Sequence, residues 1–141
     1  MIIRLFRAFL ALLVTFLFLF GIPILFFTIS TKFFGVRLPV RLVMGDIYLV
    51  VVAKFVVAAS FVVIYAMMVE GRRTTGVIYG MILALLMFLA GALSDTVVSF
   101  AFYDLPYDYS RLVVIGNAVA YMLSGLTISR IYAPPSPEIY V

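Results

Sequence analysis

Residues 47–69 read IYLVVVAKFVVAASFVVIYAMMV, an apolar run that is interrupted by one charged side chain, Lys54. A helix that crosses the ~30 Å hydrocarbon core of a bilayer needs about 20 mostly apolar residues, so this run predicts a transmembrane helix. The whole chain of 141 residues has the same character, with 67% hydrophobic and 11% charged residues. Soluble domains are about 45–50% apolar and about 25% charged. We therefore predict a chain that folds in lipid.

Three other runs have the same length and composition. The predicted spans are residues 5–29, 47–69, 77–98 and 112–131. Because a helix satisfies all its backbone hydrogen bonds internally, these runs predict an all-α integral membrane protein. We expect residues 1–132 to form one domain, an antiparallel bundle of four transmembrane helices, and residues 133–141 to form an extended tail.

The first apolar run, Leu5–Ile29, has a basic start and could be mistaken for a signal peptide. It is longer than the usual ~7–15-residue core of a signal peptide, and no A-x-A cleavage site follows, so we expect a retained span. Thr15 is its lone polar residue near the middle. We expect this span to face lipid or the apolar flank of another subunit.

Small residues recur at every fourth position in two other spans. They are Gly76, Gly80 and Ala84 in the third span, and Gly116, Ala120 and Ser124 in the fourth. Such stripes let helix backbones approach closely in membranes, where no hydrophobic drive brings helices together. We expect these stripes to form helix–helix contacts.

Few polar residues lie inside the spans, and four of them fall at a similar depth. If the second and third spans form a hairpin, Lys54 lies near the depth of Asp95, which is its expected counter-ion. Asn117 on the fourth span lies at a similar depth, with Tyr121 one turn further along the same face. The pattern has two interpretations. One is a structural ion pair with Lys54 extending toward the interface, and the other is a gate or a grip on a substrate, lipid or quinone headgroup.

Two segments between the spans combine polar and apolar residues in a way that is typical of the membrane interface. Residues 30–45 read STKFFGVRLPVRLVMG, and we expect Lys32, Arg37 and Arg41 to contact lipid phosphates. Residues 99–109 read SFAFYDLPYDY and predict an interfacial aromatic belt. For both segments we favour membrane anchoring over a ligand site.

The C-terminal segment, residues 133–141, reads APPSPEIYV. Three prolines in four positions favour an extended polyproline stretch that forms no compact structure alone. We expect Pro134, Pro135, Pro137 and Tyr140 to dock on a partner chain.

The composition also argues against several classes of function. The chain has no Cys and no His, which excludes disulfides and argues against His-ligated haem, catalytic zinc and thiolate chemistry held by this chain. We therefore expect no cofactor and no enzymatic activity. Net charge is +4, but no basic groove with interleaved aromatics suggests nucleic-acid binding. The absence of Gln and Cys, with one Asn, favours a thermophilic source.

Orientation is weakly marked by the basic residues. With both termini inside, the inner side carries Arg4, Arg7, Arg72, Arg73 and Arg130, and the outer side carries Lys32, Arg37, Arg41 and Arg111. We expect both termini on the cytoplasmic side of a membrane, a prokaryotic plasma membrane rather than an organellar one.

These features favour a non-catalytic small membrane subunit of a larger complex, for which we expect a respiratory or energy-converting role, that seals lipid against a core subunit and stabilises it. Its partners would be other integral membrane subunits and lipids. The alternative is a small oligomeric transporter or channel that uses Lys54 and Asp95. The chain resembles small multidrug-efflux proteins in length and number of spans. Their key carboxylate lies in the first span, whereas Leu5–Ile29 contains no acid. The sequence therefore assigns no family.

Overall fold

The computed structural model describes residues 2–35, 44–72, 76–103 and 107–133, and these residues are helical with no strand among them. The elements are α1 (Ile2–Phe34), α2 (Met44–Arg72), α3 (Val77–Met87), the π-helical segment η1 (Phe88–Leu93), α4 (Ser94–Tyr103) and α5 (Tyr107–Tyr132). α3, η1 and α4 follow one another without a break and form the third span. The described residues thus form four helical spans, each long and apolar enough to cross a membrane.

The helices extend beyond the predicted spans, although the candidate span within α2, Ile47–Val69, has the predicted bounds. The expected interfacial segments at 30–45 and 99–109 are in part helical, because α1 continues to Phe34 and α4 continues to Tyr103. α2 also continues past the predicted span, to Arg72. Hydropathy marks only the part of a helix that lies in hydrocarbon, whereas a helix can continue through polar interfacial residues.

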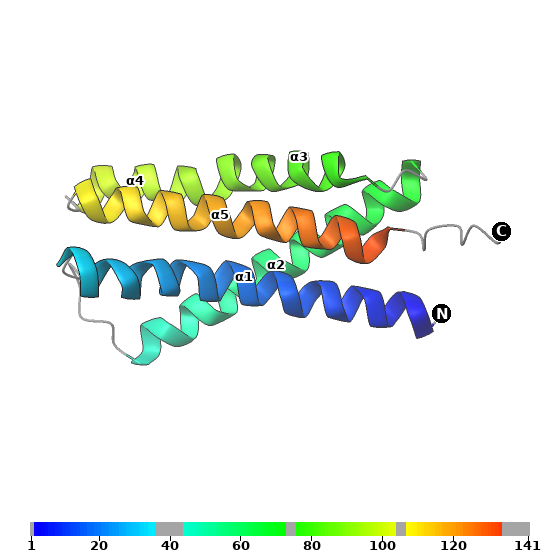
Figure 1. Cartoon of the computed structure of the whole chain (residues 1–141), viewed down its shortest axis with the longest axis horizontal. Helices are drawn as coiled ribbons and strands as arrows, with labels where there is room; N and C mark the ends of the chain where they lie inside the picture. The colour runs from blue at the N-terminus through cyan, green and yellow to red at the C-terminus, as the bar shows by residue number, and fades with distance from the viewer. Residues whose placement is uncertain (1, 36–43, 73–75, 104–106, 134–141) are drawn as a thin grey trace.

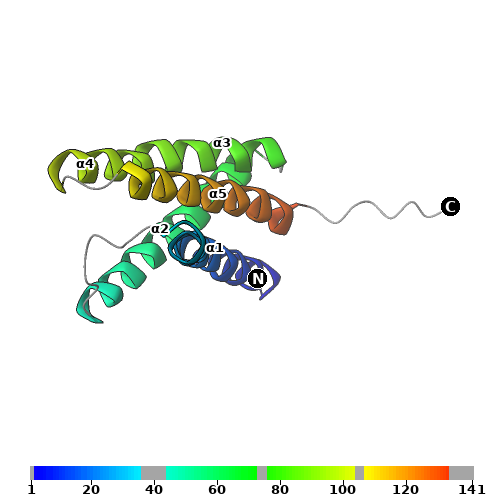
Figure 2. The same cartoon turned by 60° about the vertical axis from the view of Figure 1, so that its left-hand side comes forward.

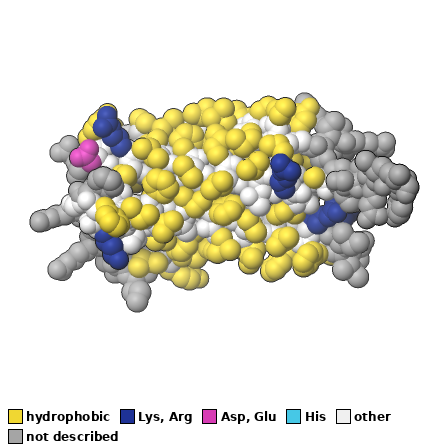
Figure 3. Space-filling view, in the orientation of Figure 1, with side chains coloured by type: hydrophobic (Ala, Val, Ile, Leu, Met, Phe, Trp, Pro, Cys, Tyr) yellow, Lys and Arg dark blue, Asp and Glu magenta, His cyan; other side chains and the backbone are white. Residues whose placement is uncertain are grey.

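Successive spans run in alternate directions along the long axis of the molecule (Figure 1). The start of α1 and the end of α5 lie at one end, and the end of α1 and the start of α5 lie at the other (Figure 1). Figure 3 shows one face, on which hydrophobic side chains cover the middle and charged groups lie toward the two ends.

The fourth span, α5, is the central helix. Of the residues in its apolar window 44% are buried, compared with 17% to 22% in the other three spans. α5 packs against α1 on one side and against α3 on the other. α2 crosses α1 diagonally in both views and touches α3 and α5 much less (Figures 1 and 2).

The expectation that the first span only faces lipid or another subunit is wrong for one face of α1. That face packs extensively on α5, and it buries Ala11, Thr15 and Leu19 almost completely. Gly116 of α5 lies against α1 in this packing. A Cβ atom added there would lie 3.5 Å from Pro23 Cα and from Phe26 Cβ, which is an ordinary van der Waals distance. The two helices are therefore close at this position, but their packing does not require a glycine.

The closest backbone contact joins α3 to α5 at two glycines. A Cβ atom added to Gly80 would collide with the carbonyl oxygen of Gly125 and lie 2.9 Å from Ser129 Cβ. A Cβ atom added to Gly125 would collide with the carbonyl oxygen of Gly80 and lie 2.7 Å from Ala84 Cβ. The stripe of Gly80 and Ala84 thus forms a contact as expected, but on α5 it meets Gly125 rather than Gly116.

Candidate functional site

The structure places the four polar residues singled out from the sequence around one cavity, which we call the polar cavity. It has a volume of about 350 Å³, and Lys54, Asp95, Asn117 and Tyr121 all line it. These side chains come from α2, α4 and α5. The similar depth of the residues along their helices and the contacts among the three spans bring them together.

Lys54 makes its hydrogen bond with α5 rather than with the expected acid. The Lys54 ammonium donates to Asn117 Oδ1 at 3.4 Å, and this contact is half-buried. Among the described residues, Lys54 and Asp95 form no ion pair within hydrogen-bonding reach, although the carboxylate still attracts the ammonium electrostatically. In place of the expected salt bridge, the Lys54 ammonium contacts the side-chain amide of Asn117. Asp95 lies further from the ammonium and attracts it without a hydrogen bond.

Asp95 stands at the outer rim of the polar cavity. Its side chain is exposed, whereas Asn117 is 6% exposed and Tyr121 is 3% exposed. Because an exposed residue helps to line it, the cavity opens at the surface of the bundle. The exposed carboxylate of Asp95 is therefore a hydrogen-bond acceptor at this opening, where a group from outside the chain can reach it.

Tyr121, which lines the polar cavity, packs against two further aromatic rings. The ring of Tyr121 packs against Phe61 at 6.3 Å and against Phe88 at 6.2 Å between centroids. Phe61 is fully buried and Phe88 is 8% exposed. The rings of Phe61 and Phe88 thus form an apolar surface against Tyr121, which lines the polar cavity.

Ser110 belongs to this site and was missed from the sequence. It lines the polar cavity, it is 8% exposed, and its hydroxyl has no hydrogen-bond partner. A buried hydroxyl without a partner costs free energy, so Ser110 is available to a polar ligand in the cavity. Its spacing could have revealed it, because Ser110 lies seven residues before Asn117 and so falls on the same helix face.

The π-helical segment η1 was also missed, and it forms one wall of the polar cavity through Gly91 and Ala92. Single π-helical turns inside α-helices occur frequently at functional sites. Just beyond η1, the hydroxyl of Thr96 donates to the carbonyl oxygen of Ala92 at 2.7 Å. This bond supplies a partner for a backbone acceptor where the regular helical pattern changes.

Of the remaining site residues expected from the sequence, the structure describes only Lys32. Lys32 is exposed in the last turn of α1, a position from which it can reach lipid phosphates. Arg37 and Arg41 lie outside the described residues. The expected docking residues of the tail, Pro134, Pro135, Pro137 and Tyr140, also lie outside them.

The chemistry of the polar cavity is that of a binding recess. It offers one ammonium, one carboxylate, one amide and several hydroxyl groups, which suits a polar or zwitterionic group. Within the described residues, no three His, Cys, Asp or Glu side chains gather closely enough to hold a metal ion. Comparison of the chain with models of protein families, with curated proteins and with solved structures finds no match.

Proposed function

We propose that the chain is a small, non-catalytic integral membrane subunit that crosses the bilayer four times as an antiparallel bundle and associates with other membrane chains. Four apolar helices of membrane length and an apolar middle with charges toward both ends support the bilayer crossing (Figure 3). The low burial of three of the spans supports association, since broad apolar faces remain for lipid and for partner helices.

The main observation behind the proposal is the exposed carboxylate of Asp95. Asp95 lies four residues before the end of the third candidate span at Ser99, about 6 Å along the helix. A charged side chain at the centre of the hydrocarbon costs at least about 2.5 kcal/mol on insertion scales, and a carboxylate that faces lipid nearer the end of a span carries part of this cost. The Lys54 ammonium donates its hydrogen bond to Asn117 and forms no close ion pair with the Asp95 carboxylate. A polar or basic group of a neighbouring chain at the opening of the polar cavity would remove this cost.

The test is the mass of the particle that contains the chain after extraction from its native membrane in a mild detergent. We expect a particle much heavier than the 15.7 kDa chain with its detergent, with other integral membrane chains in fixed ratio. Asp95→Asn should reduce the recovered complex severalfold, because the partner group loses its counter-charge. Asp108→Asn, an exposed acid in the first turn of α5, is the matched control and should leave recovery unchanged. A monodisperse monomer from native membranes would refute the proposal.

A small oligomeric transporter or channel is the second candidate, and the polar cavity favours it. A recess that holds Lys54 and Asp95 could grip a small ion or zwitterion before it crosses. In liposomes, flux that Lys54→Met abolishes and Lys32→Met preserves would promote this function. Flux that Lys54→Met leaves unchanged would retire it.

A further inference from the structure

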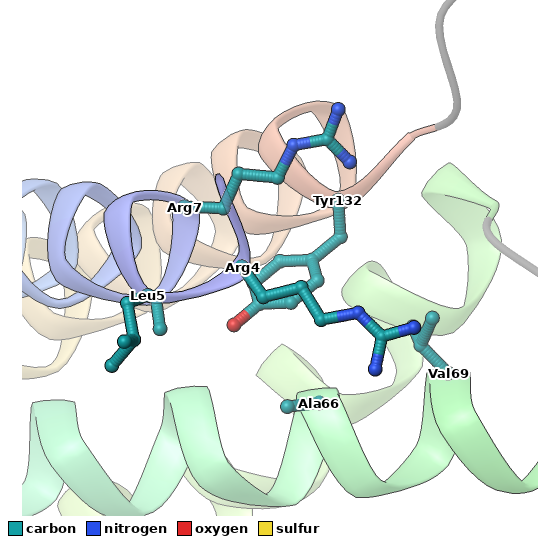
Figure 4. A pocket seen from close by; sticks show the side chains of 7 residues that line it. Arg4, Leu5, Arg7, Ala66, Val69 and Tyr132 are labelled. Atoms are coloured by element: carbon teal, nitrogen blue, oxygen red, sulfur yellow. The ribbon is translucent and has the colours of Figure 1, made fainter. Parts of the chain in front are cut away.

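A second cavity lies where the first turns of α1 meet the last turns of α2 and α5, and we call it the basic cavity. It has a volume of about 700 Å³ and is lined by Arg4, Leu5, Arg7, Ala8, Ala66, Val69 and Tyr132. Figure 4 shows the Arg4 side chain extending from α1 toward Val69 of α2, and the Arg7 side chain pointing toward the end of α5. Two guanidinium groups therefore flank one cavity, and its described lining holds no carboxylate.

The two arginines can act on the same anion. Arg4 and Arg7 are three residues apart on α1, so their side chains start from neighbouring positions of one helix face. Both side chains are long and Arg4 is exposed, so each can turn toward an anion that lies between them. A guanidinium group matches the oxygens of a phosphate with two parallel hydrogen bonds. The pair thus favours a phosphate over a single-point anion.

The surroundings of the basic cavity are those of a lipid rather than a soluble anion. Ala8, Ala66 and Val69 give the cavity an apolar wall below the arginines. Leu5, which lines the cavity, and Phe9, one turn further along α1, are each 63% exposed. An exposed apolar stripe that runs from a basic recess toward the middle of the membrane suits an acyl chain beneath a headgroup. Basic pockets between helix ends bind anionic headgroups in membrane proteins.

We propose that the basic cavity is a binding site for an anionic phospholipid. The headgroup phosphate lies between Arg4 and Arg7, and an acyl chain follows Leu5 and Phe9 along α1. The site is separate from the polar cavity and from the lipid contacts expected of Lys32, which lies in the opposite end of α1. It rests on the proposed bilayer crossing but not on a partner subunit. Its failure therefore leaves the mass of the native complex as an independent test.

The test measures lipid binding to the purified chain by native mass spectrometry in a non-ionic detergent. The probes are phosphatidylglycerol, which is anionic, and phosphatidylcholine, which is zwitterionic. We expect one phosphatidylglycerol to bind at least about tenfold more tightly than phosphatidylcholine, since charge-assisted hydrogen bonds to the phosphate are supported by net charge attraction. The double variant Arg4→Gln/Arg7→Gln should lower the affinity for phosphatidylglycerol about tenfold.

Two further variants distinguish a specific lipid-binding site from general electrostatic attraction to a basic surface. Arg111→Gln/Arg130→Gln removes the same charge from two exposed arginines outside the lining of the basic cavity and should change the affinity less than twofold. Ala66→Phe keeps the charge but fills the cavity from α2, and it should also weaken phosphatidylglycerol binding. An equal loss of affinity in both double variants, or full affinity in Ala66→Phe, would overturn the proposal. Displacement of the lipid by millimolar inorganic phosphate would assign the cavity to free anions and would also overturn it.

Discussion

Replacing Gly125 with valine should destabilise the bundle by about 3 kcal/mol, because the new side chain has no space at the contact between α3 and α5. Even a Cβ atom would collide with the backbone carbonyl of Gly80 and lie 2.7 Å from Ala84 Cβ. The obstacle is backbone and cannot rotate away, so the two helices must separate. Reversible unfolding in mixed micelles of mild detergent and SDS, followed by circular dichroism, measures this change.

Two other glycines provide controls for this prediction. Gly21 has no atom within 4 Å of its ideal Cβ position, so Gly21→Val should leave stability unchanged or slightly raised. Gly116→Ala would place its Cβ at an ordinary 3.5 Å from α1 and should be tolerated. If Gly125→Val unfolded at the same detergent composition as the wild type, the close packing of α3 on α5 would be disproved.

Replacing Asn117 with leucine should destabilise the chain by about 2 kcal/mol, because it removes the acceptor of the Lys54 ammonium and leaves that charge in a partly buried site. Leucine has a similar size, so the loss reflects the missing polar partner and not a cavity. The same unfolding measurement in mixed micelles reports the change.

The double variant Lys54→Met/Asn117→Leu completes a double-mutant cycle. With both partners apolar, no charge is left without an acceptor, and stability should return to within about 0.5 kcal/mol of the wild type. Losses that simply add in the double variant would show that Lys54 and Asn117 do not interact.

The number and character of the spans could be predicted from the sequence, because apolar length alone decides whether a helix can cross hydrocarbon. The helix ends could not, since the residues that extend α1 to Phe34 and α4 to Tyr103 are suited equally to a helix or an interfacial loop. Hydropathy does not separate these two states at the membrane surface.

The packing partners of the spans were harder to predict than the spans themselves. A small-residue stripe shows that a helix can approach another closely, but not which helix it meets. α5 carries two such surfaces: Gly116 faces α1, and Gly125 faces α3. The surface at Gly125 was not predicted, because Gly125 lies outside the stripe of every fourth residue that includes Gly116 and Ser124.

At the polar cavity, depth along each helix was predictable and facing direction was not. Depth follows from residue counts, and the structure places Lys54, Asp95 and Asn117 around one cavity. The direction each side chain takes depends on helix rotation, which the π-helical turn η1 alters just before Asp95. Lys54 therefore meets the amide of Asn117 rather than the carboxylate that simple hairpin geometry selects.

The central claim is that the chain crosses the bilayer four times, with the start of α1 and the end of α5 on one side. The accessibility of single cysteines in sealed membrane vesicles tests this claim most directly. The chain has no native cysteine, so each variant reports one position. The pair Arg4→Cys and Ala133→Cys lies at one end of the molecule, and the pair Lys32→Cys and Asp108→Cys lies at the other (Figure 1).

A maleimide that cannot cross the membrane should label Arg4→Cys and Ala133→Cys from one side only, and Lys32→Cys and Asp108→Cys only from the opposite side. Leu86→Cys, in the middle of the third span, should resist labelling from both sides. Labelling of all four terminal positions from the same side, or free labelling of the mid-span cysteine, would contradict a chain that crosses the bilayer four times.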